Sequence, residues 1–85
     1  MTKYDKMVAK VLSGRSDANI DFDDLRLLLD RLGFCERVRG SHHIFVRAGI
    51  ENMINLQRDG KLAKPYQVRL VRTVISTYGL TAEEK

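Results

Sequence analysis

The helix that organises this chain is encoded by residues 21–34, which read DFDDLRLLLDRLGF. Asp21 is a good N-cap, because its carboxylate accepts hydrogen bonds from the free backbone N–H groups of the first helical turn, and Asp24 completes a variant of the capping box. Gly33 suits the left-handed residue that follows a helix, with Phe34 folding back on the last turn. The apolar stripe that we expect to be buried consists of Phe22, Leu25, Leu28, Leu29 and Leu32.

The residues that follow this helix are typical of β-strands. Three candidate strands lie at residues 35–39, 42–47 and 51–57, where β-branched and aromatic side chains are frequent. The two links, at residues 40–41 and 48–49, are short enough to form antiparallel hairpins. The pattern therefore predicts a three-stranded antiparallel meander.

Helical patterns flank these strands on both sides. Apolar residues at helical spacing predict a short helix over residues 2–12, which ends at the breaker sequence of residues 14–17. Residues 58–64 are typical of a polar loop. Pro65 suits the first position of the last helix, and Gly79 suits its end. The apolar stripe of this last helix consists of Val68, Val71, Ile75 and Tyr78, widened by Leu70 and Val74.

A single α+β domain follows from this order of elements. The 85 residues are enough for one domain and too few for two. We assign residues 1–85 to it, with an additional N-terminal helix within residues 1–15, a core over residues 20–80, and a frayed tail at residues 81–85. In the order α-α-β-β-β-α, the amphipathic helices bury their stripes against one face of the three-stranded antiparallel sheet. The other face stays open for a ligand or a partner.

Composition and charge narrow the classes of function. The formal net charge is +4 at pH 7, and residues 31–85 carry ten Lys/Arg against five Asp/Glu, which suggests a polyanionic partner such as nucleic acid. No apolar run approaches the ~18 residues that span a bilayer, and the first residues lack the apolar stretch of a signal peptide. The lone Cys35, which we expect to be a small buried group, fits a reducing compartment. We therefore expect a cytoplasmic protein that does not act at a membrane. Because no Cys/His cluster has metal-ligand spacing, we expect no structural zinc site. We also expect no other metal and no cofactor.

Both histidines of the chain lie in residues 40–45, GSHHIF, between a glycine turn and an apolar strand. Histidine is the one side chain whose unperturbed pKa lets it exchange protons near neutral pH, so we expect chemistry here. Neighbours on a strand point to opposite faces, and the pattern leaves open whether His42 or His43 lies on the open face. If His42 does, Ile44 and Val46 accompany it, and such an apolar patch suggests a protein partner.

The combination of these stretches resembles the HicA family of bacterial toxins over residues 22–80. The matching residues are LLDRLGF at 28–34, RGSHHIF at 39–45, Gly60-Lys61 and Tyr78-Gly79-Leu80. The resemblance implies a fold similar to a double-stranded-RNA-binding domain, and the function of the toxin in a type II toxin–antitoxin pair. Such a toxin is an endoribonuclease that cleaves mRNA without the ribosome. Its partner is a HicB antitoxin, which we expect to cover the open sheet face.

The same resemblance assigns roles to two residues of the motif. The essential histidine of the family falls on His42, and the glycine of its motif falls on Gly40. The chain departs from the family in two places. Its N-terminal helix precedes the usual start, and residues 54–57 read INLQ where many members carry a proline and a histidine. A second acid or base must therefore come from His43 or from a group that is not histidine.

Metal-independent RNA cleavage needs a proton acceptor, a proton donor and cations. A base takes the proton of the 2′-hydroxyl, the oxygen attacks the adjacent phosphorus, and an acid protonates the leaving 5′ oxygen. His42 is the candidate acid or base. Ser41 is placed either to orient the imidazole or to donate to a phosphate oxygen, and Gly40 allows close approach of the substrate. The candidate phosphate contacts are Arg37, Arg39, Lys61 and Lys64. The expected products are a 2′,3′-cyclic phosphate and a 5′-hydroxyl.

Two other classes of function fit the same sequence. A non-catalytic RNA-binding module of this fold would use His42 only to contact the RNA backbone, and it would leave the RNA intact. A protein-interaction module would show no salt-dependent affinity for RNA. The adjacent histidines at the mouth of a hairpin favour the endoribonuclease, because a pure backbone binder would use Lys or Arg there.

Overall fold

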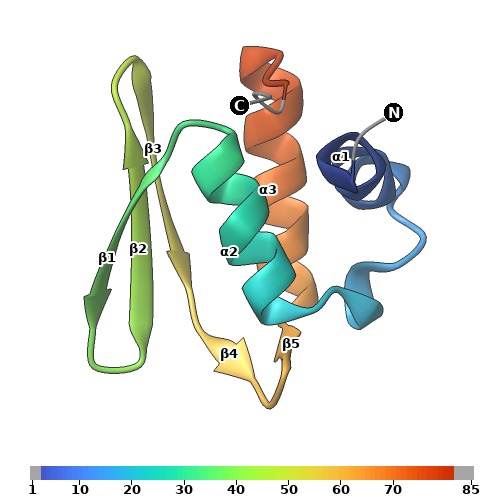
Figure 1. The fold of residues 1–85 in the computed structure, drawn as a ribbon, viewed down its shortest axis with the longest axis horizontal. Helices are drawn as coiled ribbons and strands as arrows, with labels where there is room; N and C mark the ends of the chain where they lie inside the picture. The colour runs from blue at the N-terminus through green and yellow to red at the C-terminus, as the bar shows by residue number, and fades with distance from the viewer. Residues whose placement is uncertain (1–2, 82–85) are drawn as a thin grey trace.

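The computed structural model describes residues 3–81, which form three α-helices, a three-stranded sheet and a small hairpin (Figure 1). The elements are α1 (Lys3–Ser13), the 3-10 helix η1 (Asp17–Asn19), α2 (Phe22–Arg31), β1 (Cys35–Arg39), β2 (His42–Arg47), β3 (Ile50–Leu56), β4 (Arg58–Asp59), β5 (Leu62–Ala63) and α3 (Pro65–Tyr78). The α+β class and the order α-α-β-β-β-α are confirmed. Beyond Thr81, the predicted frayed tail lies outside the described residues, as does residue 2 of the predicted first helix.

Helix α2 begins and ends as its sequence predicts. The Asp21 carboxylate accepts a hydrogen bond of 3.0 Å from the Asp24 N–H. At the other end, Gly33 has a φ of +91°. The Gly33 N–H donates to the Asp30 carbonyl and the Phe34 N–H donates to the Leu29 carbonyl, each at 3.0 Å, which is the Schellman pattern. All five residues of the predicted apolar stripe are fully buried.

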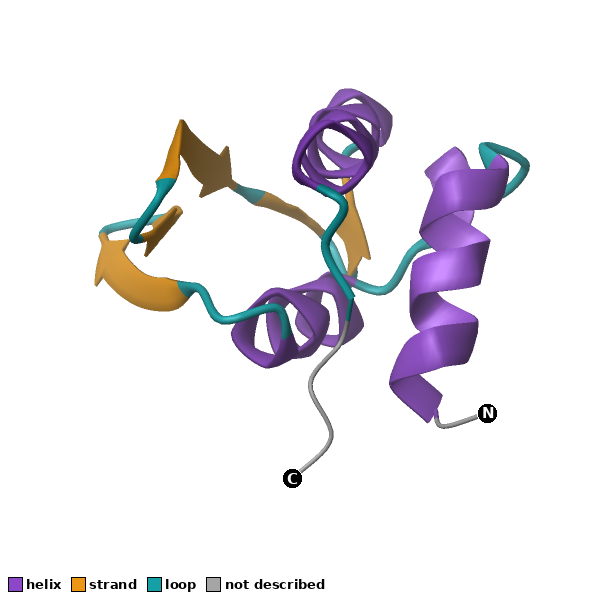
Figure 2. Cartoon of the chain, turned by 90° about the horizontal axis from the view of Figure 1, so that it is seen from above, coloured by secondary structure: helices purple, strands orange, loops and turns teal. Residues whose placement is uncertain are grey.

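The helices form two layers beside the sheet (Figures 1 and 2). Helices α2 and α3 lie against one face of the sheet, and α1 lies on the far side of them, in contact with α2 and α3. The expectation that the helices cover one sheet face is therefore confirmed for α2 and α3, whereas α1 packs on helices. No helix among residues 3–81 is long and apolar enough to cross a membrane.

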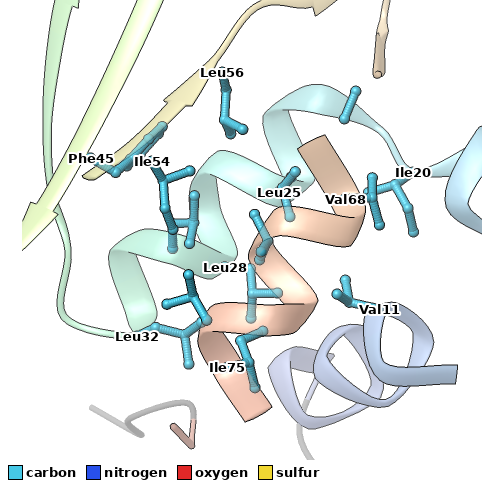
Figure 3. Close-up of a cluster of buried hydrophobic side chains, with 14 of the residues drawn as sticks. Val11, Ile20, Leu25, Leu28, Leu32, Phe45, Ile54, Leu56, Val68 and Ile75 are labelled. Carbon is cyan, nitrogen blue, oxygen red and sulfur yellow. The ribbon is translucent and has the colours of Figure 1, made fainter. Parts of the chain in front are cut away.

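The core joins all of these layers (Figure 3). The sheet contributes Phe45, Ile54 and Leu56, and α3 contributes Val68, Val71, Val74 and Ile75 against the stripe of α2. Val11 of α1 closes the cluster on the side away from the sheet. Because the core takes side chains from only one face of the sheet, the opposite face stays exposed.

The sheet is the predicted meander, in the order β1-β2-β3 with antiparallel pairing throughout. Its register sets Arg39 opposite His42 and Arg37 opposite Ile44 on the first pair of strands. On the second pair, His43 lies opposite Leu56, and the pairing shifts between Phe45 and Arg47. Continuing this register by one residue sets Gln57, just after β3, opposite His42.

The predicted polar loop at residues 58–64 contains a hairpin instead. Arg58 pairs with Ala63 and Asp59 with Leu62, because Gly60 adopts a φ of +62° and allows a tight turn. The hairpin is tied to the start of α2, since the Phe22 N–H donates to the Lys61 carbonyl at 2.9 Å.

Two predicted side-chain placements are wrong. Tyr78 is not part of the buried stripe of α3: it is 37% exposed and its hydroxyl donates to the Asn52 side chain at 3.2 Å. Cys35 is exposed rather than buried. Phe34 takes the buried position at the end of the helix, and Cys35 begins the exposed face of β1, which Arg37 and Arg39 continue at every second position.

Candidate active site at the open sheet face

The structure decides which of the two histidines faces the open side of the sheet. Phe45 is 1% exposed and must point into the core. Its neighbour two positions earlier, His43, therefore also faces the helices, where its ring meets Phe22 edge to face with the centroids 5.0 Å apart. His42 lies on the opposite face and is exposed.

Two carboxamides contact the His42 ring, one from β3 and one from the residue that follows it. The Nδ1 atom lies 3.1 Å from Oδ1 of Asn55, and the Nε2 atom lies 3.3 Å from Nε2 of Gln57. The Asn55 oxygen can only accept and the Gln57 nitrogen can only donate, so with the amides in these orientations the proton of neutral His42 is on Nδ1. The lone pair, which is the basic site, is then on Nε2.

The β1–β2 turn adds the other two residues of the motif. Gly40 has a φ of +58°, and a Cβ atom there would meet nothing within 4 Å, so the turn needs glycine for its backbone conformation alone. The Gln57 carboxamide donates to Oγ of Ser41 at 3.3 Å. Gln57 thus contacts both Ser41 and His42, and Ser41 reaches the imidazole through Gln57.

Gln57 is itself fixed by a buried residue of α3. Gln67 is 1% exposed. In the amide orientation that satisfies both groups, its nitrogen donates to the Gln57 carbonyl at 3.0 Å and its oxygen accepts from the Gln57 N–H at 2.9 Å. This pairing gives partners to the main chain of Gln57 where the ladder of β3 ends. A chain of contacts therefore runs from the core, through Gln67 and Gln57, to His42.

The two arginines expected to contact phosphate lie beside His42 on β1. Arg39 is directly opposite His42 in the register, and Arg37 is opposite Ile44. Both are exposed, and neither forms an ion pair with a carboxylate of residues 3–81. With Ile44, Val46 and Met53 they line a shallow hollow on the open face. The face is thus both cationic and apolar.

The two lysines expected to contact RNA are placed differently. Lys61 lies in the turn between β4 and β5, and Lys64 is the N-cap of α3. The β4–β5 hairpin and the β1–β2 turn lie at the same end of the molecule (Figure 1). The hollow that contains His42 is lined by Asn55, Gln57, Tyr66 and Gln67 and by neither lysine. The structure therefore brings Gly40, Ser41, His42 and Arg39 together and leaves the lysines at the margin.

Four residues of this hollow were not among the predicted site residues: Asn55, Gln57, Tyr66 and Gln67. A sequence signal existed for the first two, because they flank the buried Leu56 and so share one face of the strand. They also fall in the segment where the resemblance leads one to look for a second histidine. Tyr66 and Gln67 carry no such signal, since they reach the site only through the packing of α3 beside β3.

A second polar cluster lies on the helix-facing side of the sheet. Nδ1 of His43 lies 2.8 Å from Oε2 of Glu36, and Arg26 grips the same carboxylate with two hydrogen bonds, of 2.6 Å and 2.9 Å. Arg26 also reaches Asp23 at 3.0 Å, and Asp23 reaches Arg58 at 2.9 Å. The Cζ atom of Arg58 lies 4.5 Å from the centroid of the Phe22 ring, and Phe22 contacts His43. The contacts of the cluster therefore lead back to His43.

Charges in this cluster shift the titration of its members. The Arg26 guanidinium holds the pKa of Glu36 below its ordinary value. Arg58, and then Arg26, lower the pKa of the Asp23 carboxyl. Both carboxylate oxygens of Glu36 and the Nδ1 atom of His43 have partners within the cluster. His43 therefore joins β2 to β1 and α2.

Among the described residues, no group of three or more His, Cys, Asp or Glu side chains could hold a metal ion. Comparisons of the chain with protein-family models, with curated proteins and with solved structures found no match. The function is therefore inferred from the geometry of this site together with the sequence resemblance.

Proposed function

We propose that this protein is a metal-independent endoribonuclease, the toxin of a toxin–antitoxin pair, with His42 as its general base. The observation that carries the proposal is the placement of His42. Its ring is exposed on the open face, oriented by Asn55 and Gln57, and lies beside an arginine with no carboxylate partner among the described residues.

The tautomer of His42 fits the first step of the reaction. When RNA binds, the ribose 2′-hydroxyl replaces the Gln57 N–H at Nε2. Nε2 then takes the hydroxyl proton, and the resulting oxygen attacks the adjacent phosphorus. The bond from phosphorus to the 5′ oxygen breaks, and that oxygen takes a proton from a water molecule. The hydroxide left behind takes the proton from the His42 imidazolium, which restores the neutral base. The products are a 2′,3′-cyclic phosphate and a 5′-hydroxyl. Asn55 supports the imidazolium that forms, because its oxygen accepts a hydrogen bond from the Nδ1–H group in both charge states of the ring.

Arg39 and Arg37 supply the positive charge that the reaction needs. Neighbouring strands lie about 4.8 Å apart, so Arg39 reaches a phosphate whose sugar lies over His42. A cation there stabilises the negative charge that grows on the phosphoryl oxygens. The two arginines follow one another along β1. They can therefore contact successive phosphates of an RNA strand that lies across the open face.

The same face supports the proposal of a HicB-like antitoxin as partner. Val46 and Met53 are 49% and 58% exposed, next to the two arginines. An antitoxin that placed apolar and acidic side chains on this face would cover His42 and Arg39 together. Exposed apolar side chains gathered on one face are typical of protein interaction sites.

The test is cleavage of an end-labelled RNA in EDTA by the wild type and by His42→Ala. We expect the substitution to lower the rate by about 10²- to 10⁴-fold, with thermal unfolding like that of the wild type. His42→Ala tests catalysis, whereas Arg39→Ala tests binding. Arg39→Ala is expected to weaken the affinity for RNA and to lower the slope of its salt dependence by about one counterion. Products with 5′-phosphate ends would contradict the mechanism. Salt-dependent binding without cleavage by the wild type would make the protein an RNA-binding module instead.

A further inference from the structure

An aromatic side chain that the proposed reaction does not use stands at the rim of the His42 hollow. Tyr66 lies in the first turn of α3, is 55% exposed, and lines the same hollow as His42, Asn55 and Gln57. Among the described residues its ring has no stacking or cation–π partner, since those contacts involve other rings.

The backbone around Tyr66 is firmly placed. Pro65 fixes the start of α3 at its first position. The next residue, Gln67, is buried and paired with the main chain of Gln57. The Tyr66 hydroxyl lies 3.4 Å from the Gln67 carboxamide. A large aromatic ring is thus held at the edge of β3 and remains open to solvent. Because the groups around it are already ordered, a flat ligand can bind there with little loss of conformational entropy.

The groups beside the ring suit a nucleoside. A base in single-stranded RNA has an exposed π-face that stacks on aromatic side chains, and its edge accepts hydrogen bonds from amide groups. Asn55 supplies such an amide in this hollow, because it contacts His42 through its oxygen and keeps its NH₂ group for a ligand. Bases of a duplex are stacked within the helix and cannot reach a ring at this position.

We propose that Tyr66 is a base-stacking residue, and that this hollow takes one unstacked nucleoside of single-stranded RNA, with its ribose over His42 and next to the phosphate that Arg39 contacts. The inference rests on the proposed function for the identity of the ligand. It adds a subsite and a preference for single-stranded over double-stranded RNA. In this arrangement Arg39 of β1 contacts the phosphate, His42 of β2 contacts the ribose hydroxyl, and Tyr66 of α3 stacks on the base.

The test uses the absence of tryptophan from the natural chain. A Tyr66→Trp substitution places the only indole of the protein at the subsite. It is made in the His42→Ala background, in which cleavage of the RNA is prevented. A single-stranded oligoribonucleotide is expected to quench the indole fluorescence saturably. A duplex of the same sequence is not expected to quench it. The matched control is Tyr78→Trp in the same background, on the same helix about 18 Å away, which is expected to stay unquenched.

Affinity provides a second readout. Tyr66→Leu is expected to weaken binding of the single strand about tenfold or more, whereas Tyr66→Phe keeps it. The subsite would be overturned if fluorescence anisotropy shows that single-stranded RNA binds but the Tyr66→Trp variant is not quenched. It would also be overturned if the duplex quenches this variant equally, or if the Tyr78→Trp control is quenched equally. If the wild type cleaves RNA but no quenching occurs, only the subsite falls. If quenching occurs but the wild type leaves RNA intact, the subsite stands and the catalytic proposal falls.

Discussion

Replacing the buried amide of Gln67 should both destabilise the fold and loosen the site. Gln67→Met keeps the length and approximate volume of the side chain, so it adds no large cavity. It removes both hydrogen bonds to the main chain of Gln57, of 3.0 Å and 2.9 Å. At about 0.5–1.5 kcal/mol for each net hydrogen bond, the expected loss is roughly 1–3 kcal/mol.

Thermal unfolding followed by circular dichroism measures this loss. For a domain of this size, about 1 kcal/mol shifts the Tm by roughly 4–8 °C, so the Tm of Gln67→Met is expected to fall by about 4–24 °C. The matched control is Gln57→Ala, which removes the contact with His42 but keeps the main-chain groups that Gln67 binds. Its expected change in stability is within about 0.5 kcal/mol, as for a surface substitution.

The ¹⁵N chemical shifts of His42 separate stability from positioning. Both variants are expected to change the Nε2 environment of His42, because each one disturbs the Gln57 amide that contacts it. A Tm for Gln67→Met equal to that of the wild type would refute the structural role of the pairing. Unchanged His42 shifts in both variants would refute the chain of contacts from Gln67 to the imidazole.

Two further predictions concern the helix-facing cluster and the turn. Because Arg26 holds the folded-state pKa of Glu36 below the ordinary 4.5, this carboxylate contributes stability that is fully present above that value and is lost as the pH falls through the folded pKa. Urea unfolding should therefore show Glu36→Gln less stable than the wild type near neutral pH, with the gap closing in acid; a gap that is independent of pH would contradict this. At the turn, Gly40→Ala is expected to cost about 1–2 kcal/mol, because its φ of +58° strains an alanine, and Gly40→Asn is expected to cost less. Equal losses for the two variants in urea unfolding would show that conformation is not the cause.

Local signals in the sequence determined the elements of this fold. The cap at Asp21, the apolar stripe of α2 and the Gly33-Phe34 ending act within one or two helical turns, so the chain around them specifies where the helix begins and ends. Alternation and short links likewise predicted the three strands and their antiparallel order. These signals depend on neighbours in the sequence, which is why they can be recognised without the tertiary structure. The sequence of the first two strands and of the turn between them also provided His42, Gly40 and Arg39 as candidate site residues.

Only the tertiary structure decided how those candidates are arranged. The pattern of β2 is compatible with either histidine facing outward, and the choice depends on the burial of Phe45 against helices. The support of His42 by Gln57 depends on Gln67, which is ten residues further along the chain and on another element. Tyr66 reaches the same hollow for the same reason. A sequence specifies which side chains an element presents, whereas the contacts between elements depend on how their buried faces pack together.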